Sequence, residues 1–380
     1  MSKNSESATK DLVHIDIYAI VESTQELHFG NVRDLNVNRV ELISVPKDGA
    51  IIQKPYMSPT KVRGVARRAL LWELARLGDK KVISCGIPAT CGVCDLCKLY
   101  GALVTTQKGG KPRQSDTKTQ NAKDMKTNEQ DSSPDNDITK TETQNVKETE
   151  TEGSVASRVI QAGGVAIQEL SPTIKQRLSS PCYIINGRIG QYNAEEIKKL
   201  LRARGITGNA LDRLSQPLPY EKEYVTGLFP IYWHAYYLEK VKGSGSKMSE
   251  PQMVAFSFIE ALKRVGAGHP KGAEIKEGKI SGNTQPLVVV DIYTKPLGKR
   301  PIISISESDE KTALETFAKK ALVVDGTNTD DKANKTNHIT IKDKDGFFVF
   351  ERFIGDDAES FLRELASGLE TSSEILKPKQ

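Results

Sequence analysis

Four of the five cysteines in this chain lie in one short segment, CGIPATCGVCDLC, and this cluster constrains the fold more than any other feature. Their spacing is C-x5-C-x2-C-x2-C, which brings four thiols together on one loop. The first residues, MSKNSESATK, lack the apolar stretch of a secretory signal. In such a chain a thiol cluster favours metal binding over disulfides. The candidate ligands are Cys85, Cys91, Cys94 and Cys97.

Four thiolates in a tetrahedral arrangement are the ligands that structural Zn²⁺ prefers, and the intervening glycine and proline residues allow tight turns. A site closed by four sulfurs leaves no position for water, so we expect a structural zinc and no metal catalysis. An iron–sulfur cluster would accept the same ligands. Two other interpretations are that only three cysteines bind, with a histidine or water as the fourth ligand, and that the thiols are coincidental. Cys182 is expected to be a small apolar residue of the fold.

The 380 residues include 37% hydrophobic and 27% charged residues, enough apolar material for a core in one enlarged domain or in two domains. No run of eighteen apolar residues is present, so we expect a soluble cytoplasmic protein with no membrane partner. The net charge of +5 is only a weak indication of a polyanionic partner.

Hydrophobic periodicity predicts strands and helices in an irregular order, without repeats or heptads, which is typical of an α+β core with insertions. Strands are expected at residues 11–22, 154–170, 223–241, 285–294 and 347–355. Helices are expected at residues 58–78, 194–204, 250–265 and 357–369. The aromatic residues between Phe229 and Tyr237 are interpreted as core.

Between Gln107 and Gly153 the chain has no aromatic residue, no leucine and no cysteine. Such a tract cannot bury enough apolar surface to offset the entropy of ordering, so we expect a disordered loop that splits a domain. An inter-domain linker is the alternative. Its charge is near balance, with an acidic second half, which argues against an RNA-binding arm.

The helix expected from residue 58 begins with clear signals, Ser58 as N-cap and Pro59 at the first helical position. Its segment PYMSPTKVRGVAR resembles the motif that opens the first helix of the RAMP superfamily, which supplies CRISPR backbone subunits. The family order is a small hydroxyl residue, a basic residue, a glycine and an arginine. The matching residues are Thr60, Arg63, Gly64 and Arg67.

These four positions share one helical face, so the hydroxyl and the guanidinium groups can face a phosphate backbone while Gly64 lets that backbone approach closely. The N-terminus of the helix adds partial positive charge. An ordinary solvated basic face is the alternative interpretation.

Other segments follow the superfamily's order along residues 11 to 295. They are residues 27–30 (LHFG), the cysteine pair with residues 99–101 (LYG), residues 157–159 (SRV), residues 223–229, and the glycine-rich loop GAGHPKG at residues 266–272. The loop follows a helix and lacks Lys-Ser or Lys-Thr, so it fits neither the Rossmann nor the Walker pattern. It can present amides and a charge to phosphates through Gly266, Gly268, His269 and Lys271. A plain helix-ending turn is the alternative.

The resemblance implies an RRM-like, ferredoxin-like antiparallel-sheet core with helices on one face and with zinc-binding, lid and helical insertions. Residues 11–78 would form the first part of the core, with a lid at about 28–55. Residues 79–156 would form the zinc-binding insertion, including the loop 107–153. Residues 157–179 return to the core, 180–218 form the helical insertion, and 219–370 complete the core with a C-terminal helix.

The resemblance also implies a function in antiviral defence, most like the subtype I-D backbone subunit of Cascade-like complexes. Copies of the subunit would stack along a guide (cr)RNA, hold its phosphates and leave its bases free to pair with target nucleic acid, beside other effector subunits. The residues implied to contact RNA are Thr60, Lys61, Arg63, Gly64, Arg67, Arg158 and the 266–272 loop.

Two further hypotheses remain at this point. Related type III backbone subunits cut target RNA with an aspartate, and Asp34 lies in the corresponding loop as a candidate catalytic residue. Arg33 and Arg39 flank it, so a surface ion pair is the simpler interpretation. A stand-alone zinc-containing RNA-binding protein is the other hypothesis, although the aromatic motif of classical RRM strands is absent.

Overall fold

A computed structural model provides the structure of the chain. The described residues are 12–29, 32–34, 37–47, 49–83, 85, 90–102, 155–170, 172–176, 182–185, 188–191, 194–203, 205–214, 221–266, 272–294, 309–324, 337–342 and 348–377. The polar tract 107–153, expected to be a disordered loop, lies outside them.

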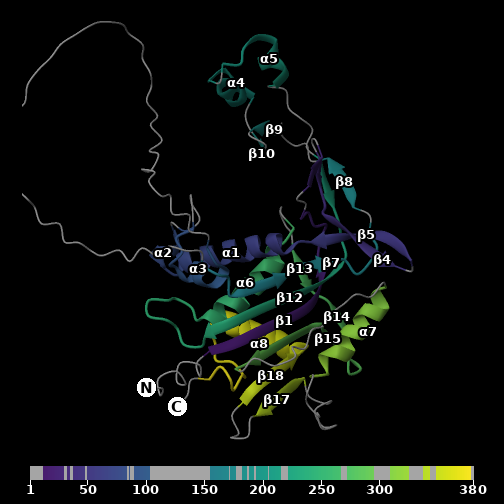
Figure 1. Cartoon of the computed structure of the whole chain (residues 1–380), viewed down its shortest axis with the longest axis vertical. Coiled ribbons are helices and arrows are strands. Elements are labelled where there is room, and N and C mark those ends of the chain that lie inside the picture. Colours follow the sequence, from purple (N-terminus) through teal and green to yellow (C-terminus); the bar gives the residue numbers. More distant parts are fainter. Residues whose placement is uncertain are drawn as a thin grey trace, which may run out of the picture.

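The centre of the molecule is an antiparallel sheet in the order β17-β18-β16-β1-β12-β6, with the short strand β13 also paired to β1 (Figure 1). Its strands are β1 (Leu12–Ser23), β6 (Val159–Ala162), β12 (Leu228–Glu239), β13 (Ala273–Ile275), β16 (Val288–Tyr293), β17 (His338–Lys342) and β18 (Phe348–Ile354). The long strands β1 and β12 pair from Leu12 with Glu239 to Glu22 with Leu228. The prediction of an α+β fold with an antiparallel core is confirmed.

Four strands of this sheet and the two helices that connect them follow the split βαβ arrangement. Helix α1 (Pro59–Arg76) comes between β1 and β6, and helix α6 (Glu250–Arg264) comes between β12 and β16. Counted along the chain, the neighbouring core strands β16, β1, β12 and β6 are the fourth, first, third and second. This is the order of a ferredoxin-like sheet, so the topology is consistent with the expected RRM-like core.

Residues of β1 alternate between two packed faces because successive side chains of a strand point to opposite sides. Val13, Ile15 and Ile17 join a core with α1, α6 and α8 (Asp356–Ser367). Trp233 of β12 packs edge-to-face on Phe258 of α6, with ring centroids 5.3 Å apart. Aromatic pairs of this kind contribute about 0.5–1.5 kcal/mol beyond area burial, which fixes α6 on the sheet.

The opposite face of the sheet carries a second core. Tyr18 and Ile20 of β1 pack there with Phe317 of α7 (Glu310–Ala321), a helix that hydrophobic periodicity did not predict. Helices therefore lie on both faces of the sheet and not on one alone. Asp309 begins α7 by accepting a hydrogen bond from the backbone amide of Thr312, at 2.9 Å.

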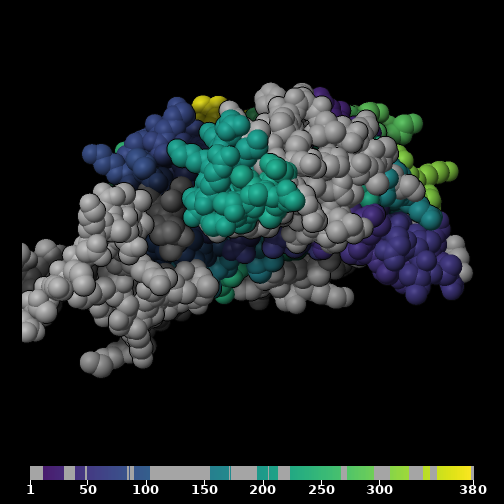
Figure 2. All heavy atoms as spheres, turned by 90° about the horizontal axis from the view of Figure 1, so that it is seen from above, coloured from purple at the N-terminus to yellow at the C-terminus, as the bar shows by residue number. Residues whose placement is uncertain are grey.

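Smaller sheets surround the core. They are β2 (Val32–Asp34), β3 (Val37–Arg39), β11 (Glu221–Tyr224) and β8 (Thr173–Gln176); β4 (Leu42–Lys47), β5 (Ala50–Met57) and β7 (Gly164–Val165); β9 (Cys182–Ile185) with β10 (Arg188–Gln191); and β14 (Glu277–Ile280) with β15 (Asn283–Pro286). The remaining helices are α2 (Lys80–Ile83), α3 (Asp95–Tyr100), α4 (Ala194–Ala203) and α5 (Gly208–Leu214). α4 and α5 lie at the top of Figure 1, away from the central sheet, and form the teal surface that faces the viewer in Figure 2.

Two expected strands are interrupted. The segment 223–241 is divided into β11 and β12, which join different sheets, and Gly227 lies at the break with a φ of 150°. The expected strand at 154–170 is divided into β6 and β7 at Gly163, where the predicted glycine irregularity is confirmed. A Cβ at Gly163 would lie 2.4 Å from the hydroxyl of Tyr56, so a larger residue there would force the Tyr56 side chain to move.

Two chain positions far apart in sequence meet beside α3. Ala102 and Val155 form an isolated antiparallel bridge, with N–H···O distances of 2.9 and 2.8 Å. Among the described residues, no helix is both long and apolar enough to span a bilayer.

Candidate metal centre and phosphate-facing helix

The four clustered cysteines come together in the structure as their spacing predicts. Their Sγ atoms all lie within 4.8 Å of one another, and all except Cys91 are buried. The Sγ of Cys97 is 3.3 Å from that of Cys85 and 3.9 Å from that of Cys91. Gly92 has a φ of 75°, a left-handed conformation that turns the chain sharply between the second and third ligands.

These distances fit a tetrahedral metal. With Zn–S bonds of about 2.3 Å, sulfur atoms in a tetrahedron lie about 3.8 Å apart, and the two measured separations fall on either side of that value. Both exceed the S–S bond length of about 2.05 Å, and the four cysteines are free thiols. The cluster is therefore close enough to hold a metal ion in an all-sulfur site.

The thiols differ in how readily they lose a proton. Burial acts to raise the pKa of Cys91, but the backbone amides of Val93 and Cys94 outweigh it and lower the pKa to about 7. For Cys94 and Cys97 burial dominates and raises the pKa. Since the thiolate is the metal ligand, binding a metal here must displace protons from the buried thiols.

The predicted phosphate-binding arginines of α1 reach the same cluster. Arg67 lies with its Nη2 atom 3.6 Å from the Sγ of Cys97 and 3.8 Å from that of Cys85. Its Nη1 atom donates to the carbonyl of Gly101 at 3.3 Å, and Arg63 donates to the carbonyl of Tyr100. Both guanidinium groups are half-buried. They place positive charge beside thiols that become negative when they bind a metal.

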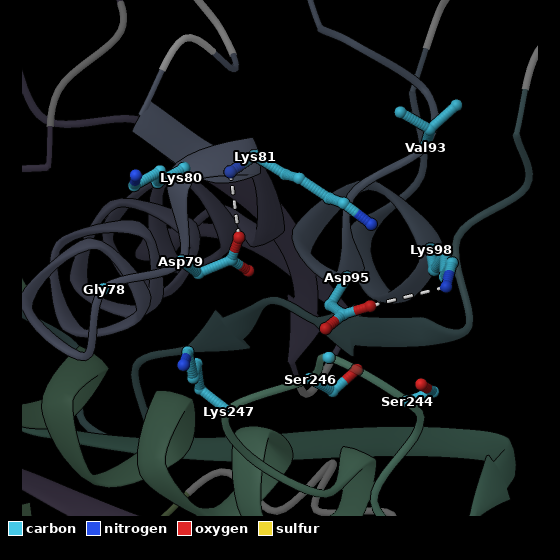
Figure 3. A pocket seen from close by; sticks show the side chains of 11 residues that line it. Gly78, Asp79, Lys80, Lys81, Val93, Asp95, Lys98, Ser244, Ser246 and Lys247 are labelled. Carbon is cyan, nitrogen blue, oxygen red and sulfur yellow. Dashed lines mark hydrogen bonds and ion pairs between the residues drawn. The ribbon is translucent and has the colours of Figure 1, made fainter.

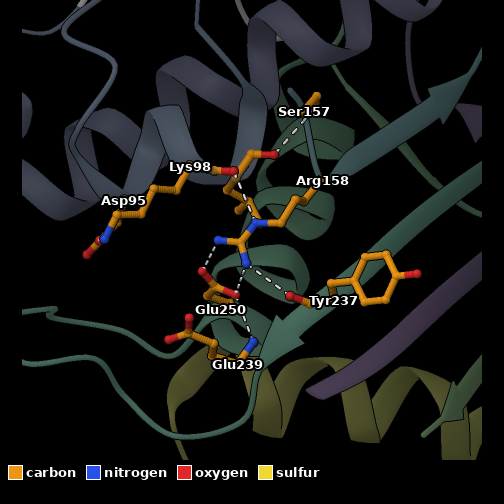
Figure 4. Close-up of polar contacts among 8 residues, drawn as sticks. Asp95, Lys98, Ser157, Arg158, Tyr237, Glu239 and Glu250 are labelled. Atoms are coloured by element: carbon orange, nitrogen blue, oxygen red, sulfur yellow. Dashed lines mark hydrogen bonds and ion pairs between the residues drawn. The ribbon is translucent and has the colours of Figure 1, made fainter. Parts of the chain in front are cut away.

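Arg158 supports the same short helix from the other side (Figure 4). Its backbone N–H donates to the carbonyl of Leu99 at 2.9 Å, and its Nε donates to the carbonyl of Lys98 at 3.2 Å. The last carbonyls of a helix have no partner within it, and here arginines from two elements satisfy them. α3, which carries Cys97, is thereby attached to both α1 and the start of β6.

The guanidinium of Arg158 also forms a two-pronged ion pair with Glu250, the first residue of α6. One N–O separation is 2.9 Å, and the same Nη1 donates to the carbonyl of Tyr237 at 2.9 Å. The side chains are 22% and 12% exposed, so water screens the pair only partly. Burial raises the pKa of Glu250 although Arg158 and the amide of Glu239 act in the opposite direction. Sequence reasoning missed Glu250 because its partner lies far away along the chain.

The other predicted RNA contacts of α1 lie near its N-terminus. Thr60 is exposed, Lys61 and Gly64 are half-exposed, and the hydroxyl groups of Ser58 and Thr60 are 3.2 Å apart. Ser58 occupies the predicted N-cap position, although its side chain makes no capping hydrogen bond, and the predicted Pro59 begins the helix.

Gly64 is not required by the packing of the described residues. A Cβ placed on it would meet only the Nη1 atom of Arg68, at an ordinary contact distance of 3.6 Å. Gly266 is the opposite case. Its φ is 95°, and a Cβ there would lie 2.6 Å from the Cδ2 atom of Leu27. Gly266 thus has a structural role in seating the turn that contains Leu27, while Gly268, His269 and Lys271 lie outside the described residues.

Asp34 ends β2 and pairs through its backbone with Val37 in the adjacent strand. Its side chain is outside the described set, so its catalytic role stays a prediction. Arg39, one of its neighbours in sequence, has its Nη1 atom 3.2 Å from a carboxylate oxygen of Glu223.

A buried polar cluster lies on the sheet face opposite α1 and was not predicted. Asp16 of β1 accepts hydrogen bonds from the Nδ1 atom of His234 at 2.5 Å and from the hydroxyl of Tyr293 at 3.1 Å. Asp291 forms a fully buried, two-pronged ion pair with Arg352, at 2.6 and 2.7 Å. The available signal was an aspartate in the middle of each of two apolar strands, DIYAIV and VVVDIY.

Comparison with known proteins finds likeness only among solved structures. No family model matches the chain, and no curated protein matches it. It is similar to Thermofilum pendens Csc2, with 15% identity over 84% of this chain and 75% of that chain and a TM-score of 0.35. It is also similar to chains of two CRISPR RNA-guided surveillance complexes. The first has 10% identity over 83% and 78% of the two chains and a TM-score of 0.33. The second, in a pre-nicking state, has 11% identity over 81% and 87% and a TM-score of 0.35. These values are too low to add weight to the residues themselves.

Proposed function

We propose that this chain is a guide-RNA-binding backbone subunit of a CRISPR interference complex. The observation that carries the proposal is Gly64, which occupies the interior of an α-helix at a position where the packing of the described residues leaves room for a side chain. Glycine destabilises a helix interior by about 1 kcal/mol relative to alanine. A glycine inside a helix that packing does not require leaves its backbone open to the close approach of a ligand backbone.

The surroundings of Gly64 favour an anionic ligand. Thr60 supplies an exposed hydroxyl one turn earlier, and Lys61 supplies a positive charge. No acidic residue lies in the first turn of α1, so the partial positive charge of the helix N-terminus is not neutralised there. Hydroxyl groups, lysine and a helix N-terminus are common phosphate contacts in nucleic-acid complexes.

The sheet also favours phosphate contacts over base stacking. Classical RRM domains stack bases on aromatic side chains of the sheet surface. Here the face opposite α1 is packed by Phe317 of α7 and contains the buried pair of Asp16 and His234. A subunit that grips phosphates leaves the bases free, which is what pairing of a guide with its target requires.

The finer features of the proposal follow the family resemblance. The chain would assemble with copies of itself along the crRNA, beside other effector subunits, most like the subtype I-D backbone subunit. The four cysteines would hold a structural Zn²⁺, with Arg67 offsetting part of the negative charge of four thiolates. The support for the guide-RNA-binding role comes from the residues of α1.

The test compares Gly64→Leu with Ser360→Leu. Ser360 is an exposed residue of α8, so the control adds the same side chain to a helix surface elsewhere. Each full-length protein is purified with zinc, the RNA that copurifies is sequenced, and affinity for a guide RNA is measured by fluorescence anisotropy.

We expect the wild-type chain and the Ser360→Leu variant to carry short RNAs that share repeat-derived ends. Gly64→Leu should bind guide RNA at least tenfold more weakly because a bulky side chain keeps the phosphates away from the helix. Random RNA on the wild-type chain, or equal affinity of the two variants, would contradict the proposal and favour a stand-alone RNA-binding protein.

A further inference from the structure

A basic pocket lies where the cysteine-containing segment meets the core, at the C-terminal end of α1 (Figure 3). Its volume is about 270 Å³. Three segments that are distant in sequence line it: the turn after α1 with α2, the start of α3, and the loop between β12 and α6. The charged and hydroxyl-bearing lining residues include Asp79, Lys81, Asp95, Lys98, Ser246 and Lys247.

Positive charge exceeds negative charge in this pocket. Its described lining residues include four lysines (Lys80, Lys81, Lys98 and Lys247) and two carboxylates. Both carboxylates already have partners. Asp79 accepts from the backbone N–H of Lys81 at 2.9 Å, and Asp95 lies 3.4 Å from the Nζ atom of Lys98.

The other cations of the pocket have no such partner. Within the described part of the chain, Lys80, Lys81 and Lys247 make no ion pair. Figure 3 shows the Lys81 side chain extending from α2 across the pocket toward α3. All four lysines are exposed to solvent, so they can meet an anion that enters the pocket, and a hollow lined mainly by one sign of charge raises the local concentration of the opposite sign.

The uncharged residues that line the pocket indicate what type of ligand it can bind. Among the described lining residues, Val93 alone has an apolar side chain larger than alanine, and none is aromatic. These residues favour a polar, charged ligand over a hydrophobic one. Ser244 and Ser246 add hydroxyl groups on a glycine-containing turn, in which the Ser246 N–H donates to the carbonyl of Gly243 at 3.0 Å.

The size of the pocket favours a strand over a free ion. Its volume of about 270 Å³ is many times the roughly 10–15 Å³ that a single water needs, so it has room for a ligand larger than one small ion. We propose that this pocket binds the phosphate backbone of a nucleic-acid strand. The contacting cations would be Lys81 and Lys247, together with Lys98, whose exposed Nζ atom lies 3.4 Å from Asp95 and can turn from it to a phosphate.

The pocket is separate from the proposed guide surface. Helix α1 has 18 residues and is therefore about 27 Å long. Thr60 lies in its first turn, whereas Gly78 and Asp79 of the pocket follow its last turn. A strand held here would contact the protein at a second place, independently of Gly64.

The experiment removes three pocket charges and compares the result with a matched loss of charge. The pocket variant is Lys81→Gln/Lys98→Gln/Lys247→Gln. The control is Lys199→Gln/Lys279→Gln/Lys319→Gln, three exposed lysines on α4, β14 and α7 that do not line the pocket. Both are full-length and zinc-loaded, and equal zinc content and thermal midpoint establish that both are folded. The probe is a fluorescent random-sequence single-stranded RNA.

We expect the pocket variant to bind the RNA about tenfold more weakly than wild type, and the control to bind within about twofold. The slope of log affinity against log salt should become shallower by about 0.7 for each phosphate that the variant no longer neutralises. Equal affinity and equal slope in the two variants would overturn the proposal.

Two competitors identify the source of the phosphate. Binding of inorganic pyrophosphate without binding of RNA would overturn the strand as the ligand, and so would tighter binding of poly-glutamate than of RNA. A loss of affinity in the pocket variant together with unchanged affinity in Gly64→Leu would leave this pocket supported while the guide role of α1 fails.

Discussion

The replacement Gly64→Ala should make the protein more stable and bind RNA less well. Gly64 lies in the interior of α1, where alanine is favoured over glycine by about 1 kcal/mol. A Cβ at this position would meet only the Nη1 atom of Arg68 at 3.6 Å, so no clash offsets the gain. For a chain of this size a gain of about 1 kcal/mol corresponds to an increase of about 2 °C in melting temperature.

Gly78, which follows the end of the same helix, supplies a control for the stability measurement alone. It follows the C-cap residue Leu77 with a φ of 82°, and nothing lies within 4 Å of a Cβ placed on it. Gly78→Ala is the same chemical change in a left-handed conformation, so it should destabilise the protein by about 1 kcal/mol. The two replacements are therefore expected to change stability in opposite directions.

Stability is measured by urea unfolding of the full-length, zinc-loaded proteins followed by circular dichroism, and affinity by anisotropy with a guide RNA. We expect Gly64→Ala to raise the urea midpoint and to weaken RNA binding about threefold or more, because a methyl group holds the phosphate backbone away. If Gly64→Ala lowers the midpoint, the glycine serves packing after all. If it raises the midpoint and leaves the affinity unchanged, no ligand approaches this face.

Three further perturbations test the structure around this helix. Arg158→Ala should lower the free energy of unfolding by about 2 kcal/mol because it leaves the partly buried carboxylate of Glu250 without its main partner. A double-mutant cycle with Glu250→Gln that shows no coupling would contradict this. The protons released on Zn²⁺ binding should increase by about one between pH 8 and pH 6, because Cys91, with a pKa of about 7, becomes protonated over that interval; calorimetry in buffers of different ionisation enthalpy measures the number. Gly266→Ala should destabilise the protein by about 2 kcal/mol or more, from its left-handed φ and the clash with Leu27, and a neutral effect in urea unfolding would argue against this packing.

Features that depend on local sequence were predicted well. The helix from Pro59 follows from a serine N-cap, a proline at the first position and a run of good helix formers, all of which act within a few residues. The cysteine cluster follows from ligand spacing, because Cys91, Cys94 and Cys97 are too close in sequence to separate far in space. The long strands β1, β12 and β16 follow from their apolar and β-branched residues.

Features that depend on contacts between residues far apart in the sequence could not be predicted in the same way. The segment 223–241 has one continuous β-forming composition, yet Val225 bridges to Leu27 and the two halves join different sheets. The shared helical face of Arg63 and Arg67 was predictable, but the carbonyls at the end of α3 that accept their hydrogen bonds were not. The basic pocket is a further example, because its lysines come from three separate segments that only the folded chain brings together.

The bridge between Ala102 and Val155 makes the fold a convenient host for inserted domains. Its paired hydrogen bonds hold the two ends of the segment 103–154 side by side at the border of the core. When the ends of a segment already meet, each doubling of its length costs only about 0.6 kcal/mol. The segment can therefore be exchanged for one of quite different length or origin while the surrounding structure is retained. A fluorescent or affinity module grafted there would label the protein within its body and leave both chain termini untouched.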